Sequence, residues 1–566
     1  EIMYTRPAEL PALAGPVSMN GVSLIDDNGI KMVDNASLML EPGSRVALIG
    51  AGGSGKEQIA RLLARLMSPT SGKITMSGED LAALPEAAVG ARIAYTSGES
   101  YLFNGTIFEN LVFGLQHVAE DESEMSSERQ SQHEEALASG NSPANFALDW
   151  IDYGGAGATG PDDFLDRLAK VVTAVELEDD LFRMGLRQTI DPNGNSDLTQ
   201  GILWARLRIQ DDLARRGMTD LVRQYDPESF NPYVSVAENI LFGVSRDPAW
   251  EVDEMAANPV ITGLLEDELL LDRFEETGRS VAETMVELFA NLHSGDPLFE
   301  RYSFLDEDAL DDLQIVVRRL GSSETKEASE ADREVLRSLA LKLVPQRHQL
   351  GLVDDAFEEA VLRLRRRLRQ VIDEESDSED GGGRITFFDR AAYSSGLTIE
   401  GNILFGSVAH GRPDAPEEVG AVVDTIMDDL GLRQAVVQAA LEIPSGIGGG
   451  RLSPTVRQKI ALARAVLKQP RLLIIDEALT ALDGASRARL LANLDGLFPE
   501  GTILWIDSEL PPDMTFDRVI NVRAGRVEDI EAEPTERAEA APGEAEAEIE
   551  ADSLAAMAAR LMRVPM

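Results

Sequence analysis

The sequence predicts an α/β fold built around a phosphate-binding loop and interrupted by a large, mainly helical insertion. Short apolar stretches, typical of buried strands, alternate with helical segments at both ends of the chain, as they do in α/β cores. One such strand, at 45–49, runs directly into GAGGSGK at 50–56 and then into a helical segment at 57–67. Residues 116–384 lie between the two ends and are acidic with a helical pattern. Loops in compact domains rarely exceed about 15 residues, so this stretch is an inserted structure.

The composition excludes several classes of protein. A chain of 566 residues is too long for one ordinary domain of about 100–200 residues. The net charge of −47 argues against a nucleic-acid partner, which needs a basic surface. The absence of cysteine excludes disulfides and thiolate metal sites. No apolar run reaches the roughly 18 residues that span a bilayer. Because the chain starts at Glu1 without a signal peptide, we expect a soluble piece of a longer chain.

The segment before the insertion, 17–115, is predicted to form the first part of the core. Residues 1–16 are rich in proline and are interpreted as a linker. Short stretches bounded by turn-forming residues then predict strands. These strands are expected at 17–19, 36–40, 73–76 and 92–95.

The segment after the insertion, 385–530, is predicted to form the second part of the core. Residues 471–477 read as a buried strand that ends in the carboxylates Asp476 and Glu477. Further elements are expected as an apolar strand at 502–506 and a terminal hairpin at 519–527.

Two segments follow the core. Residues 531–553 are rich in Glu, Ala and Pro and are predicted to be a disordered acidic linker. Residues 554–566 have a helical pattern and end in LMRVPM. This ending resembles the opening helix of cyclic-nucleotide-binding domains; a plain amphipathic helix is the alternative.

A short motif occurs three times and indicates partial duplication of one subdomain. TIFENLVFG at 106–114 recurs as SVAENILFG at 235–243 and as TIEGNILFG at 398–406. A Ser or Thr opens each copy, as suits a helix N-cap. The second and third copies align without gaps back to Tyr225 and Phe388. The insertion also carries a basic run at 363–369, which we interpret as a solvated helix face rather than a binding patch.

The loop at 50–56 matches the G-x4-G-K pattern of phosphate-cradling loops. Its glycines let backbone N–H groups approach a phosphate, and the following helix N-terminus adds partial positive charge. Lys56 is placed to reach the terminal phosphates. Glu57 stands where a Ser or Thr hydroxyl would bind Mg²⁺. The alternative for the loop alone is a glycine-rich turn without a ligand.

The two carboxylates at the end of the 471–477 strand suit phosphate chemistry. Asp476 is placed to hold Mg²⁺, directly or through water, and Glu477 could polarise an attacking water as a general base. An apolar strand ending in Asp-Glu is weak evidence alone. An upstream phosphate-binding loop makes it strong.

With LSPTVRQKIALARA at 452–465 added, the sequence resembles the ATP-binding cassette (ABC) family, and in particular the ATPase domains of ABC exporters. The resemblance covers 17–115 and 385–530 and includes FNGTIFENLVFG at 103–114. It implies the ABC type of P-loop NTPase fold and ATP with Mg²⁺ as cofactors. It makes Asp476 the Walker B metal ligand and Glu477 the catalytic base.

The resemblance also assigns the remaining site positions. Ser453 in the signature segment would reach the γ-phosphate of ATP on a partner cassette, and Asp483 would be the D-loop aspartate. Ser508 occupies the catalytic switch position. The phosphate-binding Walker A residues would be Gly50, Gly52, Gly53, Ser54, Gly55, Lys56 and Glu57.

Several positions depart from the family pattern. Asp26 replaces the aromatic residue that stacks on adenine, and Gly98 replaces the Q-loop glutamine. Pro454 and Thr455 replace the two signature glycines, and Pro454 removes a backbone N–H. Ser508 replaces the switch histidine. With Glu57, these changes predict weak or absent hydrolysis.

The resemblance implies a cytoplasmic ATPase portion of a transporter at the inner membrane. Its partners would be a transmembrane domain, in the same longer chain or a separate subunit, and a second cassette in a homodimer or heterodimer. Residues 104–114 would face the transmembrane part. The alternative is a degenerate cassette that does not hydrolyse ATP and that senses nucleotide or serves as a docking or dimerisation module.

Overall fold

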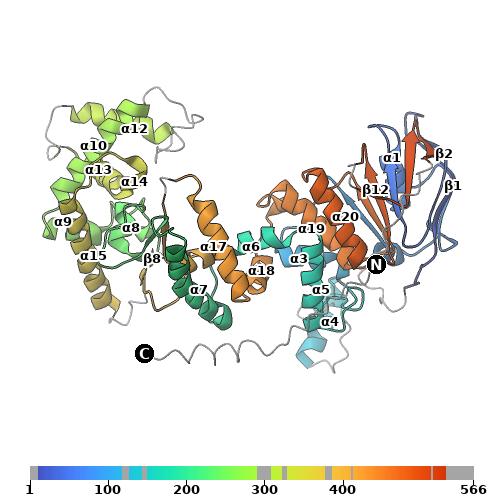
Figure 1. Ribbon diagram of the computed structural model, residues 1–566, viewed down its shortest axis with the longest axis horizontal. Helices are drawn as coiled ribbons and strands as arrows, with labels where there is room; N and C mark the ends of the chain where they lie inside the picture. Colours follow the sequence, from blue (N-terminus) through green and yellow to red (C-terminus); the bar gives the residue numbers. More distant parts are fainter. Residues whose placement is uncertain are drawn as a thin grey trace. The chain divides into compact units, whose positions relative to one another are not determined.

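The computed structural model describes residues 10–117, 127–142, 149–245, 247–289, 307–321, 325, 328–376, 385–409, 412–510 and 514–530. The chain forms two compact units (Figure 1). The P-loop unit comprises Pro11–Tyr95, Pro470–Glu477 and Glu500–Met566, and the helical unit comprises Glu1–Leu10, Thr96–Gln469 and Ala478–Pro499. The predicted segments 531–553 and 554–566 lie outside the described residues. The domain boundaries drawn from the sequence remain predictions.

A six-stranded sheet carries the P-loop. Its strand order is β14-β13-β3-β12-β11-β6. The bounds are β3 Arg45–Ile49, β6 Ile93–Ser97, β11 Leu472–Asp476, β12 Thr502–Asp507, β13 Arg518–Arg523 and β14 Arg526–Ile530. Every residue of β11 and β12 is buried, as expected of parallel strands covered on both faces. In Figure 1 the orange-red β12 lies beside blue elements from the start of the chain.

The register of this sheet places the predicted site residues at one edge. β12 runs parallel to both β3 and β11, with Asp507 opposite Ile49 and Asp476 opposite Ile506. The carboxyl ends of these three strands therefore meet, which is the usual ligand-binding edge of an open α/β sheet.

A four-stranded sheet in the order β2-β1-β4-β5 completes the P-loop unit with two helices. Alternating burial along β2 indicates one covered and one solvated face. The bounds are β1 Val17–Ile25, β2 Lys31–Leu40, β4 Ser71–Met76, β5 Glu79–Asp80, α1 Lys56–Leu63 and α2 Glu86–Arg92. The strands expected at 17–19, 36–40, 73–76 and 502–506 and the terminal hairpin are confirmed. The predicted helix at 57–67 is shorter and ends at Leu63.

The helical unit confirms the helical pattern of the inserted stretch. Its longer helices are α4 Ser127–Ser139, α5 Pro161–Ala174, α6 Glu178–Leu186, α7 Ser196–Arg215, α9 Pro259–Asp267, α10 Leu271–Phe289, α12 Glu307–Leu320, α13 Glu330–Lys342, α15 Asp355–Ser376, α17 Ala415–Asp429, α18 Arg433–Leu441, α19 Pro454–Leu467 and α20 Gly484–Leu497. Its short elements are α3 Ile107–Val112, α8 Val236–Leu241, α14 Pro345–His348, α16 Ile399–Leu404, β7 Val222–Gln224, β8 Gly243–Ser245, β9 Ile385–Phe387 and β10 Gly406–Val408. A cluster of buried apolar side chains, with Phe274 and Phe357 stacked inside it, forms a core under α8, α10, α13 and α15.

The three copies of the repeated motif fold alike. They form the short helices α3, α8 and α16, each capped by a Ser or Thr hydroxyl that accepts a backbone N–H. An asparagine in each helix closes the preceding loop. Asn239, for example, accepts from the N–H of Asn231 at 2.8 Å and donates to its carbonyl at 2.8 Å. Asn110 and Asn402 make the same pair of bonds with Phe103 and Ser394.

Each short helix packs against a long helix that presents an arginine. α3 packs on α19, α8 on α15 and α16 on α7. Because α7 comes before α16 and α19 comes long after α3, these two pairings join distant segments of the chain. The guanidinium lies over a phenylalanine ring in each case: Arg464 over Phe103, Arg365 over Phe242 and Arg206 over Phe405.

The second and third copies form an internal pseudo-twofold pair. β7 of the second copy pairs with β10 of the third, with Gln224 opposite Gly406. β8 of the second pairs with β9 of the third, with Gly243 opposite Phe387. In the ungapped alignment of the copies, these two residue pairings are equivalent. The structure therefore supports the duplication inferred from the sequence.

Arg206 and Arg365 hold the two halves of this pair. The Arg206 guanidinium is fully buried. It donates to the side-chain and main-chain oxygens of Asn402 and to the carbonyls of Asp389, Arg390 and Ala392. Burial lowers its pKa to about 10, so it remains charged at neutral pH.

Arg365 makes the equivalent contacts in the second copy. It donates to both oxygens of Asn239 and to the carbonyls of Asp226, Pro227 and Ser229. The prediction that the basic run 363–369 is a solvated helix face is therefore wrong at Arg365, which is buried, although Arg366 is exposed.

We predict that Arg206→Met destabilises the helical unit by at least about 3 kcal/mol. The change removes a buried charge and leaves the carbonyl groups that it bonds without a donor. The measurement is thermal unfolding followed by tryptophan fluorescence. Arg208→Met is the control, because Arg208 lies on the same helix, is partly exposed and pairs with Asp429 and, at 3.7 Å, with Asp212, which keeps Arg215 as a partner; we expect a cost below about 1 kcal/mol. Equal decreases in melting temperature for the two variants would contradict the prediction.

Candidate functional site: the phosphate-binding loop

The loop between β3 and α1 contains two crowded glycines and two glycines that face open space. A Cβ at Gly55 would lie 2.5 Å from the Met32 carbonyl, and one at Gly50 would lie 2.6 Å from the Val522 carbonyl. Gly53 and Gly55 also have positive φ angles, 75° and 101°, which favour glycine. In contrast, a Cβ at Gly52 or Gly53 would meet nothing within 4 Å. Two glycines thus fix the loop, and two leave open space in front of its backbone.

Lys56 begins α1 and is held by the predicted catalytic base. The lysine side chain is only 1% exposed, and its Nζ lies 2.7 Å from Oε1 of Glu477. Glu477 directly follows β11; its N–H donates to the Ile506 carbonyl at 2.9 Å and its φ is 46°. A positive φ in a non-glycine residue stores strain and is common at functional sites. The structure thus brings Lys56 and Glu477 together as an ion pair.

Asp476 ends β11 and is bonded by a tyrosine of the neighbouring segment. The Tyr95 hydroxyl donates to Oδ2 of Asp476 at 2.7 Å. Burial raises the pKa of Asp476, and the carboxylates of Glu57 and Glu477 raise it further, while the Tyr95 bond opposes the rise. Burial and the Asp476 charge raise the pKa of Tyr95 to about 12, so its hydroxyl remains a donor.

The residues present fit the phosphates of ATP and a divalent cation. Among the described residues, Ser54 Oγ and Asp476 Oδ1 are buried and have no hydrogen-bond partner, which is costly unless a ligand or water bonds them. Ser54 belongs to the loop itself, and Asp476 ends β11 at the same edge of the sheet. Mg²⁺ prefers carboxylate, phosphate and water oxygens. Glu57, on the first turn of α1, supplies a carboxylate where a hydroxyl is usual.

Ser508 belongs to the same edge of the sheet. It directly follows β12, which lies between β3 and β11. Its side chain is exposed, and its N–H donates to Oδ1 of Asp507 at 2.8 Å. A serine hydroxyl at this position lacks the imidazole needed to carry a proton near neutral pH.

Ser453 and Asp483 belong to the helical unit, and their roles in the site remain predictions. Ser453 caps α19, and its Oγ accepts from the N–H of Val456 at 3.3 Å. Pro454 is the first residue of that helix, where a missing N–H is tolerated. Asp483 caps α20 by accepting from the N–H of Ser486 at 2.8 Å, a bond that lowers its pKa.

The positions of two departures from the family pattern are also described. Asp26 closes the turn between β1 and β2 by accepting from the N–H groups of Asn28 and Ile30. The carbonyl of Gly98 accepts from Nε2 of Gln458, on α19, at 3.2 Å.

Sequence reasoning missed Tyr95 and Arg61 as parts of the site. Arg61 forms a hydrogen bond with Tyr95 and lies near Glu57 and Asp476. A signal was available for Arg61, because it follows Glu57 by one helical turn and therefore shares its face of α1. No comparable pattern identifies Tyr95, whose partner is set by the pairing of strands.

A parallel sheet whose carboxyl edge carries this loop, a buried lysine and a strand-terminal aspartate defines a P-loop NTPase fold. Within that class the chain has the nucleotide-binding domain fold of the ABC transporters: residues 33–160 match the family model described as "ABC transporter".

Curated relatives agree with this assignment. A fatty acid ABC transporter ATP-binding/permease protein of Mycobacterium bovis is 35% identical over 114 residues, which are 20% of this chain and 18% of the relative. An ATP-dependent lipid A-core flippase of Methylococcus capsulatus is 40% identical over 101 residues, 18% of this chain and 17% of the relative. ABC transporter B family member 28 of Arabidopsis thaliana is 37% identical over 95 residues, 16% and 13% of the two chains.

The matched regions thus cover less than a fifth of each of these relatives. Among the described residues, no helix is both long enough and apolar enough to cross a membrane. The described residues likewise include no cluster of three or more His, Asp or Glu side chains that could hold a metal ion by themselves.

We predict that Glu477→Gln tightens Mg-ATP binding roughly fivefold. The substitution removes a negative charge from the site and leaves the buried Lys56 ammonium in need of an anion. The measurement is equilibrium titration with a fluorescent ATP analogue. Glu79→Gln, at an exposed carboxylate of β5 in the same unit, is the control and should leave affinity unchanged. Equal or weaker binding by Glu477→Gln would show that the ion pair does not compete with nucleotide.

Proposed function

We propose that this chain is the nucleotide-binding part of an ABC transporter and binds Mg-ATP at the loop 50–56. In this role it works with a transmembrane partner and with a second cassette at the cytoplasmic face of the membrane, and closure of the two cassettes on ATP moves the transmembrane helices. The observation that carries the proposal is the open backbone at Gly52 and Gly53 next to the buried Lys56.

The electrostatics of the site support ATP as its ligand. A buried lysine and the N-terminus of α1 supply positive charge where phosphates would lie. Lys56 is paired with a single carboxylate that is 38% exposed, so a triphosphate could replace it. Mg²⁺ bound to the phosphates and to Asp476 would neutralise part of the charge that Glu57 and Glu477 add.

We propose further that hydrolysis is slow or absent. Glu57 adds a carboxylate beside the phosphates, and Ser508 cannot carry a proton as a histidine does. Pro454 lacks an N–H at the start of α19, where a signature glycine would offer one to the partner's ATP. The retained Asp476 and Glu477 leave open a low rate of turnover.

A nucleotide-sensing or docking module is the second candidate, and one observation favours it. The Lys56–Glu477 ion pair stabilises the site without nucleotide, so the ligand-free state is itself well defined. In this case ATP changes the conformation of a membrane complex without being consumed.

We predict that the chain binds Mg-ATP saturably and that Lys56→Ala weakens binding at least about tenfold, because the substitution removes the buried ammonium that faces the phosphates. The measurement is isothermal titration calorimetry. Lys73→Ala is the control: Lys73 lies in β4 of the same unit, is 56% exposed and pairs with Asp80, so this variant should bind like the unsubstituted chain. No binding by the unsubstituted chain at millimolar ATP would overturn the proposal.

We predict that Glu57→Thr tightens ATP binding about tenfold in Mg²⁺ and much less in EDTA. The change removes a weak repulsion from the phosphates, about 0.5 kcal/mol or twofold in affinity, in both conditions, and supplies a metal-binding hydroxyl that acts only with Mg²⁺. Glu86→Thr is the matched control, since Glu86 occupies the first turn of α2. This variant should change the ATP affinity neither in Mg²⁺ nor in EDTA. An equal gain with and without Mg²⁺ would leave charge repulsion as the whole effect and exclude the hydroxyl's role.

A further inference from the structure

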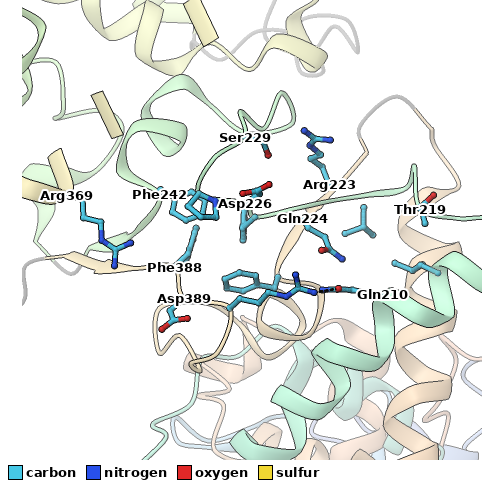
Figure 2. A pocket seen from close by; sticks show the side chains of 16 residues that line it. Gln210, Thr219, Arg223, Gln224, Asp226, Ser229, Phe242, Arg369, Phe388 and Asp389 are labelled. Carbon is cyan, nitrogen blue, oxygen red and sulfur yellow. Dashed lines mark hydrogen bonds between the residues drawn. The ribbon is translucent and has the colours of Figure 1, made fainter. Parts of the chain in front are cut away.

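We infer that the helical unit has a second ligand site, separate from the phosphate-binding loop, for a small organic anion with an apolar body. The site is the hollow on the pseudo-twofold axis between the second and third copies (Figure 2). Its volume is about 920 Å³, within the range of about 300–1,000 Å³ typical of sites for small organic ligands.

Four aromatic rings form the apolar part of the hollow. Tyr225 and Phe388, at equivalent positions of the two copies, stack with ring centroids 4.5 Å apart. Phe242 and Phe405, again equivalent, meet them edge to face. All four residues line the hollow, and Tyr225 and Phe388 are only half-buried. The rings thus give a rigid floor with apolar surface still to cover.

The two halves of the hollow match where residues support the fold and differ where they face solvent. Tyr225 and Phe388 are one matched pair, and Arg206 and Arg365 are another. The differing pairs lie at the rim. Arg223 aligns with Thr386, Pro227 with Arg390, and Gln210, one turn beyond Arg206 on α7, with Arg369, one turn beyond Arg365 on α15.

Each differing pair contributes one arginine, so the rim carries three guanidinium groups. Arg223, Arg369 and Arg390 all line the hollow and all are exposed. In the view of Figure 2, Arg369 lies on one side of the labelled aromatic residues and Gln210 on the other. Symmetry of the fold does not require these arginines, because the equivalent half forms without them. Arginine forks bind carboxylate, sulfonate and phosphate groups well.

The two carboxylates of the hollow offset only part of this charge. Asp226 accepts from the N–H of Glu228 at 2.9 Å, and Asp389 accepts from the N–H of Ala391 at 2.8 Å. Each therefore stabilises its own turn. The residues that line the hollow thus carry three guanidiniums against two carboxylates, on a chain whose net charge is −47, and Arg369 also lies 3.9 Å from Asp373. Such a local field attracts small anions.

The test uses the dye anilinonaphthalene sulfonate (ANS) and its uncharged analogue N-phenylnaphthylamine, titrated against the full chain by fluorescence. We expect one saturable ANS site. In the double variant Arg369→Gln with Arg390→Gln, ANS binding should weaken about tenfold or more, while binding of the uncharged dye changes less than about twofold. Arg366→Gln with Arg367→Gln, at exposed positions of the same helix, is the control and should bind ANS normally.

Three results would overturn the inference. The first is no saturable ANS binding, and the second is ANS binding that the Arg369 and Arg390 substitutions leave unchanged. The third is ANS that is displaced by ATP and lost in Lys56→Ala, because the dye would then occupy the phosphate-binding loop. Unchanged ANS binding by Lys56→Ala supports a separate site, and this inference stands or falls independently of the proposed ATP function.

Discussion

Parallel pairing of strands from the two ends of the chain is the constraint on which the nucleotide site depends. β3 lies before the insertion, and β12 and β11 lie after it, yet they pair in one register. That register sets Lys56 against Glu477 and puts Ser508 on the same edge. A slip of one residue would turn every side chain of a strand to the other face. Because β11 and β12 are buried on both faces, the close fit of their side chains, rather than an alternating pattern, opposes such a slip, so core packing positions the site.

The sequence predicts most of the P-loop unit because its signals are local. The apolar strands, the glycine loop and the terminal Asp476 can each be recognised within a few residues. The Lys56–Glu477 pair and the Tyr95–Asp476 bond cannot, because their partners are set by strand pairing across the insertion. The misjudged Arg365 has the same cause. Its charge pattern resembles a solvated face, and only the carbonyl groups of the distant loop 226–229 explain its burial.

The helical unit shows how one small motif can be used three times with different partners. An asparagine closes each loop and an arginine from a long helix covers it, so the pattern works wherever such a helix is supplied. The second and third copies, which pair about the pseudo-twofold axis, keep the four aromatic rings and the arginines Arg206 and Arg365. The positions at the rim of the hollow are not needed for this pairing, and they have diverged between the two copies. Divergence at solvent-facing positions on a conserved frame is how duplicated scaffolds acquire new binding properties.

The two helix pairs that join distant segments of the chain, α3 with α19 and α7 with α16, have a consequence for folding during synthesis. α3 leaves the ribosome long before its partner α19, and α7 is synthesised long before its partner α16, which follows most of the insertion. Until then the faces of α3 and α7 that pack on these later helices have no native cover. Contacts between distant segments slow folding, and exposed apolar faces favour aggregation meanwhile. Production of this chain should therefore depend on chaperones that hold early helices until the last third of the polypeptide arrives.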